Sequence, residues 1–279
     1  MAEILVSIDR LQSLASSGTS LLVDCRFDLS NPEKSFQDYL EGHIPGALYA
    51  HLDKHLSSAI TPQSGRHPLP DADQFAGFLA SIAWQPNKLL VAYDEASNAF
   101  SGRLWWLMRY FGLNAALLDG GLAAWKKAAL PLEQGQPAIS PGNKPELSVT
   151  PGLTVNATDI LESKGQLTLV DARVPERYSG AVEPLDSKAG HIPGALNRPL
   201  GLNLNADGYF KSPAQLRAEF LSLLSDRKIS NVVHYCGSGV TACHNAFSME
   251  LAGLGSTRIY PGSWSEWVRD PSRPIETGN

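Results

Sequence analysis

The second half of this chain repeats the first, and this repetition limits the possible folds more than any other feature. The string GHIPGA occurs at residues 42–47 and again at 190–195. Three further pairs keep the same order along the two halves: LLVDCR and TLVDAR, LLVAYD and NVVHYC, and LLDGGLAAW and IYPGSWSEW. Matches in a constant order and at a nearly constant spacing indicate a duplicated domain with small insertions in its loops.

The duplication predicts two domains of one fold, and a chain of 279 residues is long enough for both. We expect the N-terminal domain over residues 1–133 and the C-terminal domain over residues 153–279. Residues 134–152 contain several prolines and glycines and no periodic apolar pattern. That composition is typical of a linker.

In each half, short apolar runs alternate with segments of helical periodicity. Helices are expected over residues 75–82 and 101–112 in the first half, and over 214–225 and 239–255 in the second. This alternation favours α/β units on a mostly parallel sheet. Functional sites of such sheets lie at the carboxyl ends of the strands.

The net charge of −5 provides no large basic face, so nucleic acid is not an expected partner. No apolar run approaches the roughly 20 residues that cross a bilayer, and no membrane association is expected. The start of the chain, MAEILVSIDR, carries Glu3, Asp9 and Arg10 and has no basic region before an apolar core, so it is not expected to be a signal peptide. The three cysteines are too few for a disulfide framework and lack zinc-site spacing. We therefore expect reduced thiols, a cytoplasmic location and no bound metal.

The stretch NVVHYCGSGVTAC places Cys236 at the end of an apolar run and the start of a glycine-rich turn. The thiolate is the reactive form of cysteine. Gly237 and Gly239 let the backbone curl so that successive N–H groups converge, beside the positive end of the following helix. Ser238 and Thr241 add hydroxyl donors. The loop is therefore predicted to hold a negatively charged sulfur, or an anion attached to it.

The repeat aligns Cys236 with Asp94 in the first half, where the glycine pattern is absent. A carboxylate cannot do the chemistry of a thiolate, so the first domain is expected to be catalytically inactive. Cys25 lies in a predicted strand and Cys243 lies one turn into a predicted helix. Both are interpreted as buried structural residues.

Two other uses of a cysteine in such a loop are disfavoured. A phosphatase needs an arginine soon after the nucleophile to clamp the phosphoryl group, and the residues after Cys236 are Gly, Ser, Gly, Val, Thr, Ala, Cys and His. A redox sensor would pair Cys236 with Cys243. One helical turn and a loop separate these two residues, which is poor geometry for a direct disulfide.

The two GHIPGA signatures, the CGSGVTA loop, and the LLDGGLAAW and PGSWSEW elements together resemble the two-domain rhodanese family of sulfurtransferases. The resemblance covers almost the whole chain. It implies that each domain is a mostly parallel five-stranded sheet with helices on both faces. It also implies that Cys236 takes a sulfur atom from a donor as a persulfide and passes it to an acceptor, without a cofactor.

The neutral CGSGVT loop is similar to that of 3-mercaptopyruvate sulfurtransferases, and thiosulfate is the alternative donor. The resemblance implies that Arg177 binds the substrate carboxylate. An anionic substrate needs a cation, and the loop itself contains none. Such enzymes usually place a second carboxylate-binding arginine shortly before the second GHIPG. Lys188 is the only cation in that stretch here, and it offers a point charge in place of a planar fork.

The resemblance further implies that Ser238 joins a proton relay whose histidine corresponds to His43. His191 occupies the same motif in the other half, so a structural role for both histidines stays open. Phe100 is implied as an apolar wall near the active loop. The loop residues implied to bind substrate are Gly237, Gly239, Val240 and Thr241.

The acceptor implied by the resemblance is a thiol, such as that of thioredoxin, or cyanide. From a different class of function comes a non-catalytic rhodanese-like binding module. The retention of Cys236 within an intact glycine loop argues against that alternative.

Overall fold

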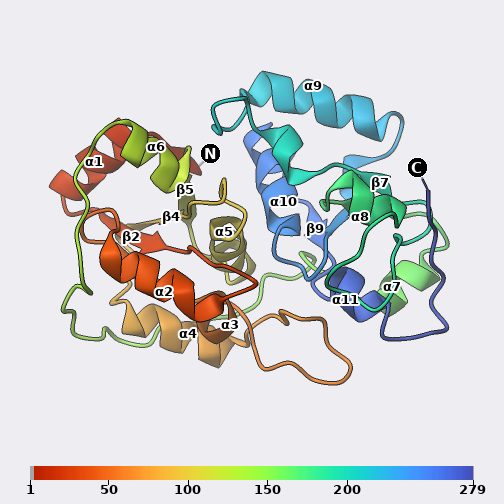
Figure 1. Cartoon of the computed structure of the whole chain (residues 1–279), viewed down its shortest axis with the longest axis horizontal. Helices are drawn as coiled ribbons and strands as arrows, with labels where there is room; N and C mark the ends of the chain where they lie inside the picture. Colours follow the sequence, from red (N-terminus) through yellow and green to blue (C-terminus); the bar gives the residue numbers. More distant parts are fainter. Residues whose placement is uncertain (1–2, 279) are drawn as a thin grey trace. The chain divides into compact units, whose positions relative to one another are not determined.

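The computed structural model describes residues 3–278, which form two compact units. Both units are α/β sheets, and each is built around one copy of the repeat (Figure 1). Unit 1 comprises the residues up to Ser58, Leu69–Thr150 and Asp207–Tyr209. Unit 2 comprises Ala59–Pro68, Pro151–Ala206 and the residues from Phe210 onward.

Unit 1 contains a five-stranded parallel sheet in the order β1-β5-β4-β2-β3. Its strands are β1 (Leu5–Val6), β2 (Ser20–Asp24), β3 (Leu48–Tyr49), β4 (Leu89–Tyr93) and β5 (Ala115–Leu118). Its helices are α1 (Ile8–Ser16), α2 (Pro32–Glu41), α3 (Leu52–His55), α4 (Ala72–Ser81), α5 (Ser101–Tyr110) and α6 (Gly121–Lys127). The central strand β4 reads LLVAY and is almost entirely buried, as a parallel strand covered on both faces requires.

Unit 2 contains a parallel sheet in the order β7-β6-β8-β9. Its strands are β6 (Thr168–Asp171), β7 (Leu196–Asn197), β8 (Val232–Tyr235) and β9 (Arg258–Ile259). Its α-helices are α7 (Ala157–Glu162), α8 (Pro175–Ser179), α9 (Pro213–Leu224), α10 (Ala242–Leu251) and α11 (Ser263–Trp267). Two 3₁₀ turns, η1 (Leu200–Asn203) and η2 (Ile229–Asn231), complete it.

The fifth strand expected in the second domain is reduced to a single bridge. Thr154 pairs in parallel with Ile259 of β9, at the position where β1 pairs with β5 in unit 1. Two backbone hydrogen bonds hold it, from Val155 N–H to the Ile259 carbonyl and from Ile259 N–H to the Leu153 carbonyl, both 3.0 Å. A turn at residues 151–152 and a bend at Leu153 precede the bridge.

Helices cover both faces of the unit 2 sheet, as expected. Alternate side chains of a strand point to opposite faces. Leu169 and Val233 pack in one cluster with residues of α7, α8 and α11, whereas Val170 and Val232 pack in another with residues of α9 and α10. Both faces therefore contribute to the apolar core, and the carboxyl ends of the strands are left for the site.

One segment from the first half of the sequence folds as part of unit 2. Residues 59–68 follow α3 in the chain, yet they pack in unit 2. The guanidinium of Arg269 donates to the carbonyl of Pro62 at 3.0 Å. The repeated motifs predict domains that are contiguous in the sequence. They give no sign that residues 59–68 and Asp207–Tyr209 pack in the other unit, because neither segment lies in a repeated motif.

None of the helices formed by residues 3–278 is long and apolar enough to span a membrane.

Candidate active site

The Cys236 loop joins the carboxyl end of β8 to α10, whose N-cap is Thr241. The backbone N–H of Gly239 donates to the Cys236 Sγ at 3.2 Å. Gly239 has a φ of +77°, and a methyl group on it would lie 2.2 Å from the Pro261 carbonyl oxygen. Only glycine fits this position, and its left-handed backbone aims an amide at the sulfur.

The PGSWSEW element fixes the loop from a second side, at the start of α11. The Cys236 N–H donates to the Ser263 hydroxyl at 3.1 Å, and the Trp264 N–H donates to the Cys236 carbonyl at 3.0 Å. The Ser265 N–H donates to the Gly237 carbonyl at 2.8 Å. Both backbone polar groups of Cys236 are thus held, which orients its side chain over the loop.

The other two cysteines have different surroundings. Burial raises the pKa of the Cys25 thiol well above its usual value, and the charges of Asp24 and Asp94 raise it further. The Cys243 thiol donates to the Gly239 carbonyl at 3.4 Å. A carbonyl acceptor favours the protonated thiol over the thiolate. Within residues 3–278 none of the three cysteines forms a disulfide. Cys25 and Cys243 are both buried, as the sequence predicted.

His67 is a site residue that sequence reasoning missed. Its Nδ1 lies 2.7 Å from the Ser238 hydroxyl oxygen, and both side chains are buried. When the ring proton is on Nε2, Nδ1 accepts a hydrogen bond from the serine. The pair forms a hydroxyl–imidazole contact two residues from the nucleophile.

The segment 59–68 reaches the loop because two backbones approach closely. A methyl group on Gly65 would lie 2.5 Å from the Gly262 carbonyl oxygen. Next to it, the Arg66 N–H donates to the Ser265 hydroxyl at 3.0 Å. The absent side chain at Gly65 therefore lets Arg66 and His67 reach the active loop.

Two guanidinium groups converge beside Gly237, the residue after the nucleophile. A methyl group on Gly237 would lie 2.9 Å from Arg66 Nη2 and 3.4 Å from Arg177 Nη1. Within residues 3–278, neither of these two nitrogens has a hydrogen-bond partner. The structure thus brings the predicted Arg177 to the loop, together with Arg66, which the sequence did not indicate.

Two carboxylates hold the guanidinium groups in place. Arg177 donates to Glu183 through Nε at 3.1 Å and Nη2 at 2.7 Å. Asp186 accepts from Arg66 Nη1 and, at 3.2 Å, from Arg177 Nη2. Burial alone would raise the pKa of Glu183, but hydrogen bonds from Arg177 and the Leu185 backbone lower it below its usual value. Burial raises the pKa of Asp186, and the charge of Arg66 opposes that rise.

Lys188 does not join the arginines at Gly237. Its backbone carbonyl accepts from the Trp264 Nε1 at 2.8 Å. Its ammonium is near enough to Asp270 to help lower the pKa of that carboxyl, after larger contributions from Ser272 and Arg273. The second cation beside the loop is therefore Arg66.

His43 and Phe100 belong to unit 1, and their predicted roles stay predictions. The His43 Nδ1 lies 2.9 Å from the Tyr39 carbonyl, and the ring stacks on Tyr39. His191 repeats this arrangement in unit 2, with its Nδ1 2.8 Å from the Tyr178 carbonyl. The same local contacts in both repeats support the structural alternative for the two histidines.

Asp94, the counterpart of Cys236, lies in a cradle of backbone amides. Its carboxylate accepts from the N–H groups of four residues, each at 2.8 Å: Ala96, Asn98, Phe100 and Ser101. Burial raises the pKa of Asp94, and these four hydrogen bonds oppose the rise. The loop after β4 thus still surrounds an anion, although its glycines are gone.

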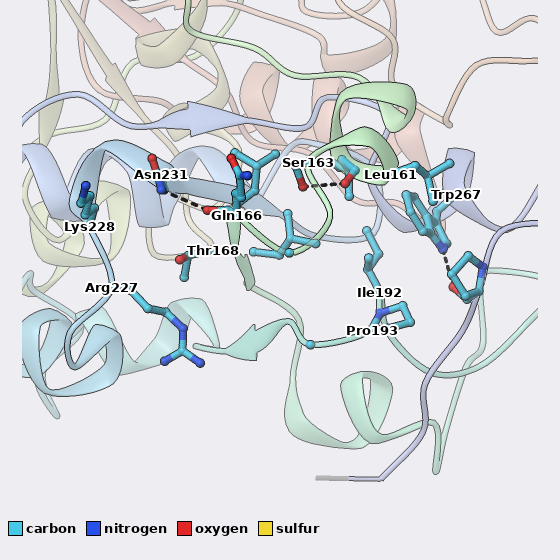
Figure 2. Close-up of a pocket in the computed structure, with 16 residues that line it drawn as sticks. Leu161, Ser163, Gln166, Thr168, Ile192, Pro193, Arg227, Lys228, Asn231 and Trp267 are labelled. Carbon is cyan, nitrogen blue, oxygen red and sulfur yellow. Dashed lines mark hydrogen bonds between the residues drawn. The ribbon is translucent and has the colours of Figure 1, made fainter.

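A hollow of about 390 Å³ lies at the other end of the unit 2 strands (Figure 2). Thr168 at the start of β6 and Asn231 just before β8 line it, and Asn231 Nδ2 donates to the Gln166 carbonyl at 3.0 Å. Cys236 follows the opposite end of β8, so this hollow is separate from the cysteine loop. Residues 3–278 contain no cluster of three His, Cys, Asp or Glu side chains placed to hold a metal ion.

The parallel sheets and the cysteine loop at a carboxyl strand end define an α/β protein with a buried thiol that accepts a hydrogen bond from a loop amide. The family model for the rhodanese-like domain matches residues 7–128 and again 156–270. The chain therefore belongs to the rhodanese family, with two tandem rhodanese-like domains.

Three known proteins illustrate the relationship. A Pseudomonas aeruginosa protein named as a probable 3-mercaptopyruvate sulfurtransferase is 43% identical, covering 99% of this chain and 98% of its own. A Mycobacterium tuberculosis protein named "Putative thiosulfate sulfurtransferase SseB" is 38% identical, with the same coverage. The crystal structure of the 3-mercaptopyruvate enzyme SseA from Escherichia coli is 30% identical, with a TM-score of 0.81, covering 95% of this chain and all of that one.

Proposed function

We propose that this chain is a sulfurtransferase that moves sulfur from 3-mercaptopyruvate to a thiol or cyanide through a persulfide on Cys236. The observation that carries the proposal is the convergence of three groups within unit 2. These are the thiol in its amide loop, the Ser238–His67 pair, and the guanidinium groups of Arg66 and Arg177.

In the first step, the Cys236 thiolate attacks the sulfur of 3-mercaptopyruvate. A sulfur–sulfur bond forms, the carbon–sulfur bond breaks, and the electron pair leaves on carbon as the enolate of pyruvate. One proton must pass from the transferred sulfur to that carbon, which yields pyruvate and a persulfide anion. The hydroxyl of Ser238 and the imidazole of His67 suit this proton transfer, because histidine exchanges protons near neutral pH.

The loop stabilises the negative charge on sulfur. The Gly239 N–H already donates to the Cys236 sulfur, and the N-terminus of α10 adds a favourable dipole. Asp94 supports this assignment by analogy. The repeated loop in unit 1 surrounds a carboxylate with amide donors, and a carboxylate oxygen lies one bond beyond Cγ, as an outer sulfur lies one bond beyond Sγ.

The substrate carboxylate binds Arg66 and Arg177. Planar guanidinium forks match carboxylates and hold them through paired hydrogen bonds. The two nitrogens nearest Gly237 are those that bind no protein carboxylate, so they remain for a ligand. Their position one residue from Cys236 suits a small keto acid whose sulfur must reach the thiol.

In the second step, a thiol such as that of thioredoxin, or cyanide, attacks the outer sulfur of the persulfide. The sulfur–sulfur bond breaks and Cys236 leaves as a thiolate, which restores the enzyme. The cycle is therefore a two-step transfer in which pyruvate departs before the acceptor reacts.

Thiosulfate is the second candidate donor, because a relative of 38% identity bears its name. In that reaction the thiolate attacks the outer sulfur and sulfite leaves with the electron pair. No proton has to move, so the Ser238–His67 pair would have no task in the first step.

Intact-mass measurement tests the proposal. The protein is incubated with each donor in turn, and then with cyanide, while pyruvate, sulfite and thiocyanate are followed. We expect a mass gain of one sulfur atom, its loss on addition of cyanide, and neither change in Cys236→Ser. Cys25→Ala is the control and should load sulfur normally. Absence of sulfur uptake from both donors would contradict the proposal and favour a binding module.

A further inference from the structure

We propose that Asp186 sets the preference between donors, because its carboxylate bridges the two guanidinium groups beside the loop and cancels part of their charge. The site then favours a singly charged carboxylate over a doubly charged anion. This inference rests on the proposed function and assigns Asp186 as a positioning residue, since it acts on substrate through Arg66 and Arg177.

The geometry of Asp186 is that of a bridge. One oxygen accepts from Arg66 Nη1 and the other accepts from Arg177 Nη2 at 3.2 Å. Its side chain is 5% exposed. Its backbone N–H donates to Glu183 Oε1 at 3.1 Å, which fixes the turn that carries it. A buried carboxylate so placed couples the positions of both arginines, since each must face it to keep the charge paired.

The charges around the site balance. Besides Arg66 and Arg177, the neighbouring Arg173 pairs with Asp171 at 2.7 Å and with Glu183 at 3.2 Å. Three cations therefore meet three carboxylates, the third being Asp186, and the Cys236 thiolate adds one further negative charge. A site without net positive charge attracts a dianion no more than a monoanion through long-range forces, and a dianion loses more hydration on entering.

Removing the Asp186 charge breaks this balance. Asp186→Asn keeps the size of the side chain and leaves one net positive charge beside Gly237. The attraction to a ligand then grows with the charge of the ligand, so a dianion gains more than a monoanion. The amide also holds the two arginines less firmly. This weakens the binding of a substrate carboxylate, which needs both guanidinium groups in their hydrogen-bonding positions.

The first experiment compares kcat/KM for thiosulfate and for 3-mercaptopyruvate at fixed ionic strength. In Asp186→Asn we expect the ratio of thiosulfate to mercaptopyruvate to rise about tenfold, which corresponds to roughly 1.4 kcal/mol of changed preference. The change should appear mainly in KM. Asp186→Glu retains the charge and should keep a ratio near that of the unmodified protein.

A matched control removes the same charge elsewhere in unit 2. Asp226 is exposed, and Asp226→Asn should leave the ratio unchanged. General damage to the fold would lower both activities together and leave the ratio as it was. An unchanged or lower ratio in Asp186→Asn overturns the proposal.

A second experiment does not depend on sulfur transfer. Iodoacetamide is neutral and alkylates the Cys236 thiolate, and anions bound beside Gly237 should protect that thiol. Protection by sulfate and by pyruvate is titrated in the unmodified protein and in Asp186→Asn. We expect sulfate to gain about tenfold over pyruvate in the variant.

The two experiments separate the possible failures. If neither donor transfers sulfur but the protection ratio shifts as expected, the proposed function fails and the role of Asp186 in anion selection stands. If sulfur transfer proceeds and neither ratio moves, the proposed function stands and the role of Asp186 is wrong.

Discussion

Ser238 and His67 form a buried hydroxyl–imidazole contact in the same loop region as Cys236. Their side chains lie 2.7 Å apart and are buried, so water competes little for the contact. Only the mercaptopyruvate reaction needs a proton to move from sulfur to carbon. The pair therefore provides a test that distinguishes the two donors.

We expect Ser238→Ala to lower kcat with 3-mercaptopyruvate by about a hundredfold, the usual effect of losing one proton-transfer group. The thiosulfate reaction should fall far less, because sulfite leaves without a proton. Initial rates of pyruvate and sulfite release measure the two effects. Ser238→Ala combined with His67→Ala should cost no more than the larger single loss, since the two groups act as a unit. Equal losses with both donors would argue for a structural role.

The loops that follow β4 and β8 occupy equivalent positions in the two repeated domains. Each leaves the carboxyl end of a central parallel strand and leads into a helix. The loop after β8 carries Cys236, and the loop after β4 carries Asp94 with four amide donors around it. In unit 1 the buried carboxylate belongs to the protein itself, and its four amide hydrogen bonds offset part of the cost of burying it.

Asp94→Asn should destabilise the protein by about 3 kcal/mol, because the variant loses charged hydrogen bonds and turns an amide NH₂ toward backbone donors. Urea unfolding followed by tryptophan fluorescence measures this change. Glu95→Gln alters the neighbouring exposed carboxylate and should change stability by no more than about 0.5 kcal/mol. Sulfur loading of Cys236 should survive in the fraction of Asp94→Asn that stays folded. Equal stability of the two variants would refute the role given to the cradle.

For the molecule as a whole, we expect the burial of His234 in β8 to reduce stability in acid. Its ring is fully buried, and neither ring nitrogen has a partner within residues 3–278. Burial lowers the pKa of His234 to about 3, with a smaller contribution from the charge of Arg198. The unfolded chain takes up this proton near pH 6.5, whereas the folded protein does so only near pH 3.

Above pH 6.5 His234 is neutral in both states and does not affect the pH dependence of stability, whereas stability falls as the pH drops from 6.5 toward 3. Within that window the free energy of unfolding should drop by about 1.4 kcal/mol per pH unit from this residue alone. His234→Leu should show a smaller loss, because leucine takes no proton. Urea midpoints measured between pH 7 and 4 give the comparison. Parallel pH profiles for the two proteins would contradict the assignment.

The sequence alone determined the features that lie in continuous motifs. The ordered repeats implied two domains of one α/β fold, and the CGSGVTA string marked Cys236, since strand end, glycine turn and helix start are neighbours in the chain. Arg177 was found through the resemblance to a family. Local patterns suffice for such features because the physical requirements act between adjacent residues.

Only the tertiary structure decided which distant side chains complete the site. His67 and Arg66 lie in a segment without a repeated motif, and they reach the Cys236 loop because residues 59–68 pack in unit 2. Asp186 lies in the stretch before the second GHIPG motif, and it bridges two cations from opposite halves of the sequence. Such contacts depend on close backbone approach and on the balance of buried charge, and neither leaves a periodic trace in the sequence.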